Sequence, residues 1–228
     1  MMVHRRYIVT LLSLLAAGCI ESGDRQISEE INPTSAEHAN AKAAPAPRIS
    51  PDTHLAAGQM LEKQGDVRGA IEQYEKAIAS SPRSVSAYNR LGILYQRMGK
   101  FDEAERIFTR GLEAQPSSAT LLNNLGYNCL SQRNYKNAEE YFRQALRTSP
   151  DFKRARMNLA IALVQSRRID DGLAQFKQVV PEDIAYGNVA VICSNAGDYA
   201  GAESALRKSL EINPDCPEAR RLLDQVVK

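Results

Sequence analysis

Apolar residues recur along most of the chain at the spacing of amphipathic helices, and the same pattern returns every 34 residues. If Val85 is counted as position 1, then positions 4, 7, 8 and 11 share one helical face, and positions 20, 24 and 27 share a face of a second helix. Glycine, aspartate, asparagine and proline stand between and after these two faces, where helices end. The pattern predicts a series of two-helix units.

Five copies of this unit follow one another, over residues 51–84, 85–118, 119–152, 153–182 and 183–216. The fourth copy has only 30 residues, and its second helix is expected to stop about one turn early, at Pro181. This shortening is either a local change of curvature that shapes a site or a tolerated deletion. Residues 217–227 place apolar side chains at helical spacing, which predicts a helix that covers the last exposed apolar surface.

Three columns of the repeat carry the packing. Position 8 is always small: Gly58, Gly92, Gly126, Ala160 and Ala190. Position 20 is also small: Ala70, Ala104, Ala138, Gly172 and Ala202. Position 24 is large: Tyr74, Phe108, Phe142, Phe176 and Leu206. Because glycine inside a helix costs about 0.5–1 kcal/mol relative to alanine, its recurrence predicts that two helices approach too closely there for a side chain. The large residues at position 24 are then expected to fill the space between repeats.

Helix ends recur at fixed positions as well. Gly65, Gly99 and Gly197 occupy position 15, which suits a left-handed helix C-cap. Position 16 holds helix-starting residues in three units, namely Asp66, Asn134 and Asp198. Position 32 is a proline that ends the second helix in four units, namely Pro82, Pro116, Pro150 and Pro214. Asp151 and Asp215, each directly after a proline, are expected to cap the helices that follow.

The 34-residue period, the two-helix unit and the small and large columns together resemble the tetratricopeptide repeat (TPR). The resemblance implies an all-α fold, a right-handed superhelical solenoid of about five helix hairpins with a capping helix at residues 217–227. The first helices of the units would line a concave groove, and the second helices would form the outer wall.

The first eighteen residues are typical of a targeting segment. Arg5 and Arg6 give it a positive end, and the uncharged run at residues 7–18 is too short to span a bilayer as a helix. The small residues directly before Cys19 resemble the lipobox of bacterial lipoproteins, although Ala16 stands where that family usually has leucine. The resemblance implies a signal peptide at residues 1–18 and a lipid on Cys19. The alternatives are an ordinary secretory signal and an uncleaved anchor.

Residues 19–50 form the expected linker between this anchor and the repeats. They are rich in Ala, Ser, Glu and Pro and lack aromatic residues, which is typical of a disordered tether. It is either a spacer or a tolerated tail. Carried over, the lipobox implies a bacterial cell-envelope protein that is lipid-anchored and faces the periplasm. The residue after the cysteine is Ile20 and not an aspartate, which favours the outer membrane over the inner one.

Charge and composition argue against several other functions. Without residues 1–18 the chain has 27 basic and 27 acidic residues, which gives no electrostatic case for nucleic acid. The three histidines, His4, His38 and His54, are scattered, and no phosphate loop, nucleophile elbow or Cys/His cluster is present. No enzyme, metal site, cofactor or small-molecule substrate is therefore expected. Cys129 and Cys193 occupy one repeat position two units apart, and are expected to be buried and unbridged.

Binding of a protein or an extended peptide segment in the concave groove is the remaining function. In TPR proteins positions 2, 5, 6, 9, 12 and 13 line the groove. The candidates here are Asn89, Arg90, Ile93, Asn123, Asn124, Tyr127, Asn158, Ile161 and Asn188. An asparagine amide offers both a donor and an acceptor to a peptide backbone; alternatively, these asparagines brace neighbouring helices. TPR receptors of chaperone tails bind a C-terminal carboxylate with a set of basic residues. Here position 5 is Leu55 in the first unit and Asn123 in the third, so this set is incomplete and a chaperone-tail receptor is not expected.

Signal, lipobox, linker and repeats in this order resemble the pilus-assembly lipoproteins of tight-adherence and type IV pili. The resemblance implies an assembly factor for a pilus or secretion machine in the envelope. The alternative is a general periplasmic adaptor for peptidoglycan enzymes or for outer-membrane protein assembly.

Overall fold

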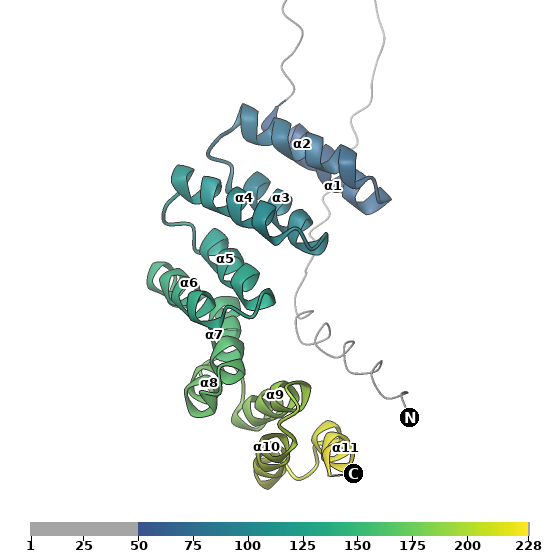
Figure 1. Ribbon diagram of the computed structural model, residues 1–228, viewed down its shortest axis with the longest axis vertical. Coiled ribbons are helices and arrows are strands. Elements are labelled where there is room, and N and C mark those ends of the chain that lie inside the picture. The colour runs from purple at the N-terminus through teal and green to yellow at the C-terminus, as the bar shows by residue number, and fades with distance from the viewer. Residues whose placement is uncertain (1–49, 228) are drawn as a thin grey trace, which may run out of the picture. The chain divides into compact units, whose positions relative to one another are not determined.

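The computed structural model describes residues 50–227, and every regular element within them is an α-helix (Figure 1). The helices are α1 (Pro51–Gln64), α2 (Val67–Ser80), α3 (Val85–Arg97), α4 (Phe101–Ala114), α5 (Ala119–Ser131), α6 (Tyr135–Thr148), α7 (Lys153–Gln165), α8 (Ile169–Phe176), α9 (Glu182–Asn195), α10 (Tyr199–Ile212) and α11 (Pro217–Val226). Five successive hairpins and a final helix confirm the predicted all-α repeat fold. The expected signal peptide and nearly all of the expected linker lie outside the described residues.

Neighbouring helices pack in a regular order. Each first helix packs against the second helix of its own hairpin, and each second helix packs against the first helix of the next. In addition α3 contacts α5, α5 contacts α7, and α7 contacts α9. Within the described residues the second helices α4, α6 and α8 make no comparable contacts with one another. The first helices therefore lie closer together than the second helices, and the side of the array that they form is called the inner face below.

The glycines at position 8 do mark a close approach, but the partner is a ring and not a second backbone. A Cβ placed on Gly58, Gly92 or Gly126 would lie 2.5, 2.2 or 2.6 Å from the position-24 aromatic ring of the same hairpin. All three rings, and Phe176 and Leu206 after them, are at most 1% exposed. The expectation that position 24 fills the space between repeats is therefore incomplete, because in the first three units the ring also fills the space above the glycine of its own hairpin.

In the fourth unit the glycine stands on the second helix and the alanine on the first, the reverse of the first three units. Its position 8 is Ala160, and its position 20 is Gly172 where the other units have alanine. A Cβ on Gly172 would lie 2.8 Å from the carbonyl oxygen of Ala160 and 2.5 Å from Cγ2 of Val164. Here α8 approaches the backbone of α7, so this hairpin needs its glycine on the second helix.

The turns inside the hairpins all pass through a left-handed residue at position 15. Gly65, Gly99 and Gly197 have φ between +73° and +82°, as predicted. The other two units place Arg133 (φ +60°) and Arg167 (φ +70°) in the same conformation. A non-glycine residue in this region costs about 1–2 kcal/mol, so the repeat geometry imposes local strain at both arginines.

Arg133→Gly is expected to raise the free energy of unfolding by about 1 kcal/mol, because glycine adopts this conformation without a Cβ clash. Arg133 has no ion pair among residues 50–227, whereas Arg167 Nη1 lies 2.9 Å from Asp198 Oδ2. Arg167→Gly is therefore expected to gain less. Urea unfolding followed by circular dichroism measures both changes. Arg133→Ala is the control, and an equal gain there would show that strain is not the cause.

The caps of the second helices follow the prediction, and those of the first helices do not. Side-chain oxygens of Asp66, Asn134 and Asp198 accept from the backbone N–H three residues on. Asp151 and Asp215 cap nothing, because each stands one residue before the N-cap, too early to reach the first turn. The first helices are instead capped in three units by a serine at that N-cap position: Ser50, Ser84 and Ser118.

The second helix of the short unit ends earlier than predicted. It stops at Phe176, five residues before Pro181, and Val179 and Val180 continue as a turn in which both N–H groups bond to the Phe176 carbonyl. The residue before a proline disfavours the helical conformation, and β-branched valines add to this preference. Lys177 bridges the junction, since it pairs with Glu182 and lies 5.3 Å from the Tyr186 ring centroid.

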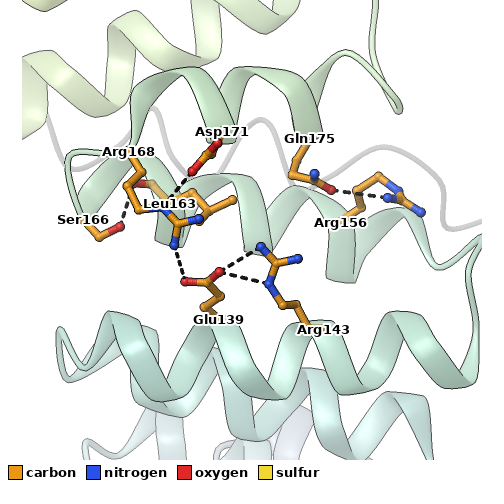
Figure 2. A network of polar contacts seen from close by, with 8 residues as sticks. All are labelled: Glu139, Arg143, Arg156, Leu163, Ser166, Arg168, Asp171 and Gln175. Carbon is orange, nitrogen blue, oxygen red and sulfur yellow. Dashed lines mark hydrogen bonds and ion pairs between the residues drawn. The ribbon is translucent and has the colours of Figure 1, made fainter.

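Arg168 compensates in part for the missing cap at the start of α8. It occupies position 16, where three of the other four units have a capping side chain, and it makes no such cap. Its guanidinium lies 2.7 Å from Asp171 and 2.8 Å from Glu139 of α6, and Glu139 also pairs with Arg143 at 2.9 Å (Figure 2). Arg143, Arg168 and Asp171 are exposed and Glu139 is half-buried, so solvent screens these pairs, and their main effect is to connect α8 with α6.

Candidate protein-binding face

The inner face presents one column of partly exposed apolar side chains. Position 9 of the first helices is Gln59, Ile93, Tyr127, Ile161 and Val191. The three aliphatic members are half-buried, and Tyr127 is 48% exposed. Side chains at positions 7 and 8 on the same helices are buried or half-buried, which shows that position 9 lies just outside the packed layer. A stripe of this kind can bind apolar side chains of another chain without any rearrangement of the core.

Asparagines beside this stripe are hydrogen-bonded to one another. Asn158 Nδ2 donates to Asn123 Oδ1 at 3.0 Å, and Asn123 Nδ2 donates to Asn124 Oδ1 at 3.2 Å. Asn124 Nδ2 then donates to Asn89 Oδ1. The series crosses from α7 to α5 to α3 and is called the amide chain below. Its rule is that position 6 of one unit donates to position 5 of the unit before.

The amide chain therefore braces the first helices against one another. Asn123 and Asn124 are 2% and 8% exposed, so much of their hydrogen-bonding capacity is used inside the protein. Buried amides that satisfy each other are stable where single unpaired ones are costly. Of the two roles considered for these asparagines, bracing is directly visible at Asn89, Asn123, Asn124 and Asn158.

Asn128, which no sequence pattern singled out, ties α5 to the preceding unit. Its side chain is fully buried; Nδ2 donates to the Phe101 carbonyl at 2.9 Å, and Oδ1 accepts from Gln96 Nε2 at 3.2 Å. The only sequence signal is that position 10 is apolar in the other four units.

Asn188 occupies the same repeat position as Asn124 and Asn158 but lacks their partner. Position 5 of the preceding unit is Met157, whose thioether is a weak acceptor. Asn188 is 9% exposed, and no side-chain hydrogen bond joins it to any other residue in the range 50–227. Asn188 is thus the one candidate asparagine with no side-chain hydrogen bond among residues 50–227.

The other end of the inner face is charged. A cleft of about 380 Å³ between α1 and α3 is lined by Gln59, Glu62, Lys63, Arg90 and Arg97. Glu62 is engaged by Arg97 and by the Tyr74 hydroxyl, which donates at 2.9 Å, and burial beside this carboxylate raises the pKa of Tyr74. Lys63 and Arg90 have no ion pair among the described residues, so this end carries unpaired positive charge.

The cysteines in the described part of the chain are free, with Cys129 and Cys193 buried as expected. Burial raises the pKa of the Cys129 thiol to about 11 and also raises the pKa of Cys193, which keeps both thiols protonated. From residue 50 to 227 no group of His, Cys, Asp or Glu side chains is arranged to hold a metal ion. No helix in the same range is both long and apolar enough to cross a membrane.

Comparison with known proteins agrees with this architecture. The family model of the cilia and flagella-associated protein 70 C-terminal domain, a TPR domain, matches residues 21–228. The chain belongs to this TPR family. No curated protein matches it in sequence.

Solved TPR structures of low sequence identity share the fold. YrrB, described as a TPR protein with an unusual peptide-binding site, has 22% identity and a TM-score of 0.55, over 74% of this chain and 89% of that one. PilF of Pseudomonas aeruginosa has 20% identity and a TM-score of 0.57, over 77% and 82%. A thermophilic TPR protein of Thermus thermophilus has 16% identity and a TM-score of 0.56, over 78% of this chain and 99% of that one. TPR arrays are typically non-catalytic scaffolds, and the fold of this chain suggests that it binds other proteins.

Proposed function

We propose that the chain is a membrane-tethered TPR scaffold that holds a segment of another protein on its inner face and helps to assemble a pilus or secretion machine in the cell envelope. The observation that carries the proposal is the position-9 stripe of partly exposed apolar side chains, flanked by asparagine amides. Exposed apolar side chains that form a row mark interaction sites more often than scattered ones do. The scaffold performs no chemistry; it binds and positions.

Two comparisons support the binding role and the setting. YrrB, which shares the fold, is described as having a peptide-binding site. PilF of Pseudomonas aeruginosa also shares the fold, and the order of lipobox, linker and repeats in this sequence resembles that of pilus-assembly lipoproteins. On this proposal Cys19 carries the lipid, residues 20–50 span the distance to the membrane, and the TPR array faces the periplasm from the outer membrane.

Cys19→Ser is expected to release the protein from the membrane. The serine has no thiol for the lipid, and without it the set of acyl chains that gives stable anchoring cannot form. Fractionation of cells into membrane and soluble material measures the change, with nearly all protein moving to the soluble fraction. Cys216→Ser is the matched control and should leave the protein on the membrane. If Cys19→Ser stays membrane-bound, lipidation at this residue is wrong.

Crosslinking in intact cells followed by purification from membranes tests the pilus assignment. A secretin or another pilus component is expected among the crosslinked partners. Recovery of peptidoglycan enzymes or of outer-membrane assembly proteins in its place would favour the general adaptor and overturn the pilus assignment.

A further inference from the structure

The first helix, α1, exposes a face that the other first helices bury. In the four later units the residues at position 3 are fully buried and those at position 10 are at most 6% exposed: Ala87, Leu121, Ala155 and Ala185, then Leu94, Asn128, Ala162 and Ile192. In α1 these positions hold Thr53, which is exposed, and Met60, which is 58% exposed. Ala56 is exposed as well and shares their side of the helix. Thr53, Ala56 and Met60 are called the open face of α1 below.

Contacts between the second and third units show what covers this face elsewhere. A Cβ added to Gly111, at position 27 of α4, would lie 2.7 Å from Cδ1 of Leu121, at position 3 of α5. Asn128 Nδ2, at position 10 of α5, donates to the carbonyl of Phe101, at position 17 of α4, at 2.9 Å. The covering element is therefore the second helix of the preceding unit, which runs antiparallel with position 17 beside position 10 and position 27 beside position 3. Within residues 50–227 no such helix precedes α1.

The sequence just before α1 has the pattern of a second helix in the matching register. Counted back by one period from the first unit, Asn32 falls at position 16, the N-cap column, and Pro33 at position 17 suits the first turn of a helix. Ala36 and Ala43 fall at positions 20 and 27, which are small in every full-length second helix. Pro45 ends the pattern after residue 44. Residues 33–44 lie outside the described residues, so this pattern comes from the sequence alone.

Two further observations favour a helix at the end of the array. The family match begins at residue 21, well before α1, so the chain ahead of α1 belongs to the matched region. Position 8 of this earlier unit would be Asp24, where every other unit has glycine or alanine, so a first helix of the repeat is not expected there. Position 24 is Asn40 in place of a large residue. A polar residue suits the outer side of a helix that covers the end of an array.

We propose that residues 33–44 form a helix that packs on the open face of α1 and covers the N-terminal end of the array as half of a repeat. The register seen between α4 and α5 then places Pro33 beside Met60 and Ala43 beside Thr53. Burial of the Met60 side chain against this segment removes apolar surface from water, which favours docking.

The two surfaces also match in shape and connection. Ala36, Ala39 and Ala43 have the same spacing of three and four residues as the open face of α1, so they share one side of the proposed helix. Their small side chains allow the two helices to approach closely. Residues 45–50 remain as the connection, a length typical between packed helices.

The docked helix would shorten the tether to the membrane, a consequence that rests on the proposed lipid anchor at Cys19. The spacer would fall from residues 20–50 to residues 20–32, which lowers its r.m.s. reach from about 30 Å to about 20 Å. Docking itself does not need the lipid. Fractionation of Cys19→Ser therefore tests the anchor alone, and the experiment below tests docking alone.

The test measures how fast maleimide labels a cysteine at residue 60 in the full chain. The background carries Cys19→Ser and Cys216→Ser, and the remaining Cys129 and Cys193 are buried. Met60→Cys should react at least about tenfold more slowly than Met98→Cys, a reference site that is 41% exposed, because the thiol reacts only when the helix detaches.

Two proline variants identify the segment that protects residue 60. Ala39→Pro breaks the proposed helix and should bring the labelling rate of Met60→Cys to within about threefold of Met98→Cys. Ala46→Pro, in the connection, is the matched control and should leave residue 60 protected. Circular dichroism and the thermal melting temperature verify that the repeats stay folded in every variant.

Each other outcome overturns the proposal. If Met60→Cys reacts as fast as Met98→Cys without any proline variant, nothing covers the open face. If Ala39→Pro leaves residue 60 protected, the occupant is not residues 33–44, and protection that grows with protein concentration would identify a second copy of the chain. If Ala46→Pro exposes residue 60 as much as Ala39→Pro does, a helix at residues 33–44 is not the cause of protection.

Discussion

Phe142→Ala is expected to lower the free energy of unfolding by about 3–5 kcal/mol. The ring is fully buried at position 24 of the central unit and lies against Gly126 of its own hairpin. It also belongs to the cluster that contains Leu159 and Leu163 of the next unit. The substitution therefore opens a cavity inside one hairpin and at its junction with the next.

The cavity cannot close easily, because the residue opposite the ring is a glycine with no side chain to move into it. Urea unfolding followed by circular dichroism at 222 nm measures the loss. Phe152→Ala is the matched control, since Phe152 is only half-buried at the start of α7 and should cost clearly less. A change of less than about 1 kcal/mol for Phe142→Ala would contradict the packing described here.

Much of the fold follows from the sequence because each column of the repeat expresses one local requirement. Small residues at position 8, large ones at position 24 and proline at position 32 give the hairpins and their order without any knowledge of long-range contacts. The glycines at position 15 likewise require only the conformation of one residue. Such local rules fix the register, and the recurrence of the register gives the solenoid.

The turns at Arg133 and Arg167 escaped prediction because nothing in an arginine indicates a positive φ. The glycines of the other units reveal the conformation, but only after the fold shows that all five turns are alike. The caps at Ser84 and Ser118 were missed for a related reason. These serines stand one residue before the first position of the unit. The prediction chose Asp151 and Asp215 as caps, but both stand one residue before the N-cap.

The sequence predicted which positions line the inner face, but it did not predict which of the asparagines there are paired with one another. Whether an asparagine braces or binds depends on what faces it from the next helix. Asn124 donates to Asn89 at position 5 of the preceding unit, whereas that position before Asn188 is Met157 and Asn188 has no side-chain hydrogen bond among the described residues. A repeat pattern assigns these residues to the same column and treats them as equivalent. Their difference appears only when the pairing rule of the amide chain is known.

Gly126→Ala is expected to lower the free energy of unfolding by about 2 kcal/mol, the usual size of overpacking in a filled core. The new methyl would lie 2.6 Å from Cε1 of Phe142, and the ring is enclosed on its other sides. Better helix propensity offsets part of the loss. Phe142→Leu alone is also expected to cost about 2 kcal/mol, from the smaller apolar surface buried.

The double variant Gly126→Ala/Phe142→Leu should cost less than the sum of the two, because leucine vacates the space that the methyl enters. The fifth unit already uses this pair, Ala190 with Leu206, and both residues are buried at 1–2% exposure. A double-mutant cycle by urea unfolding should give a coupling of about 1–2 kcal/mol. Strict additivity would mean that ring and methyl do not compete. The fourth unit combines Ala160 with the aromatic Phe176. In that unit the close approach of the two helices lies at Gly172, which shows that alanine and an aromatic ring occur together where the helices contact each other differently.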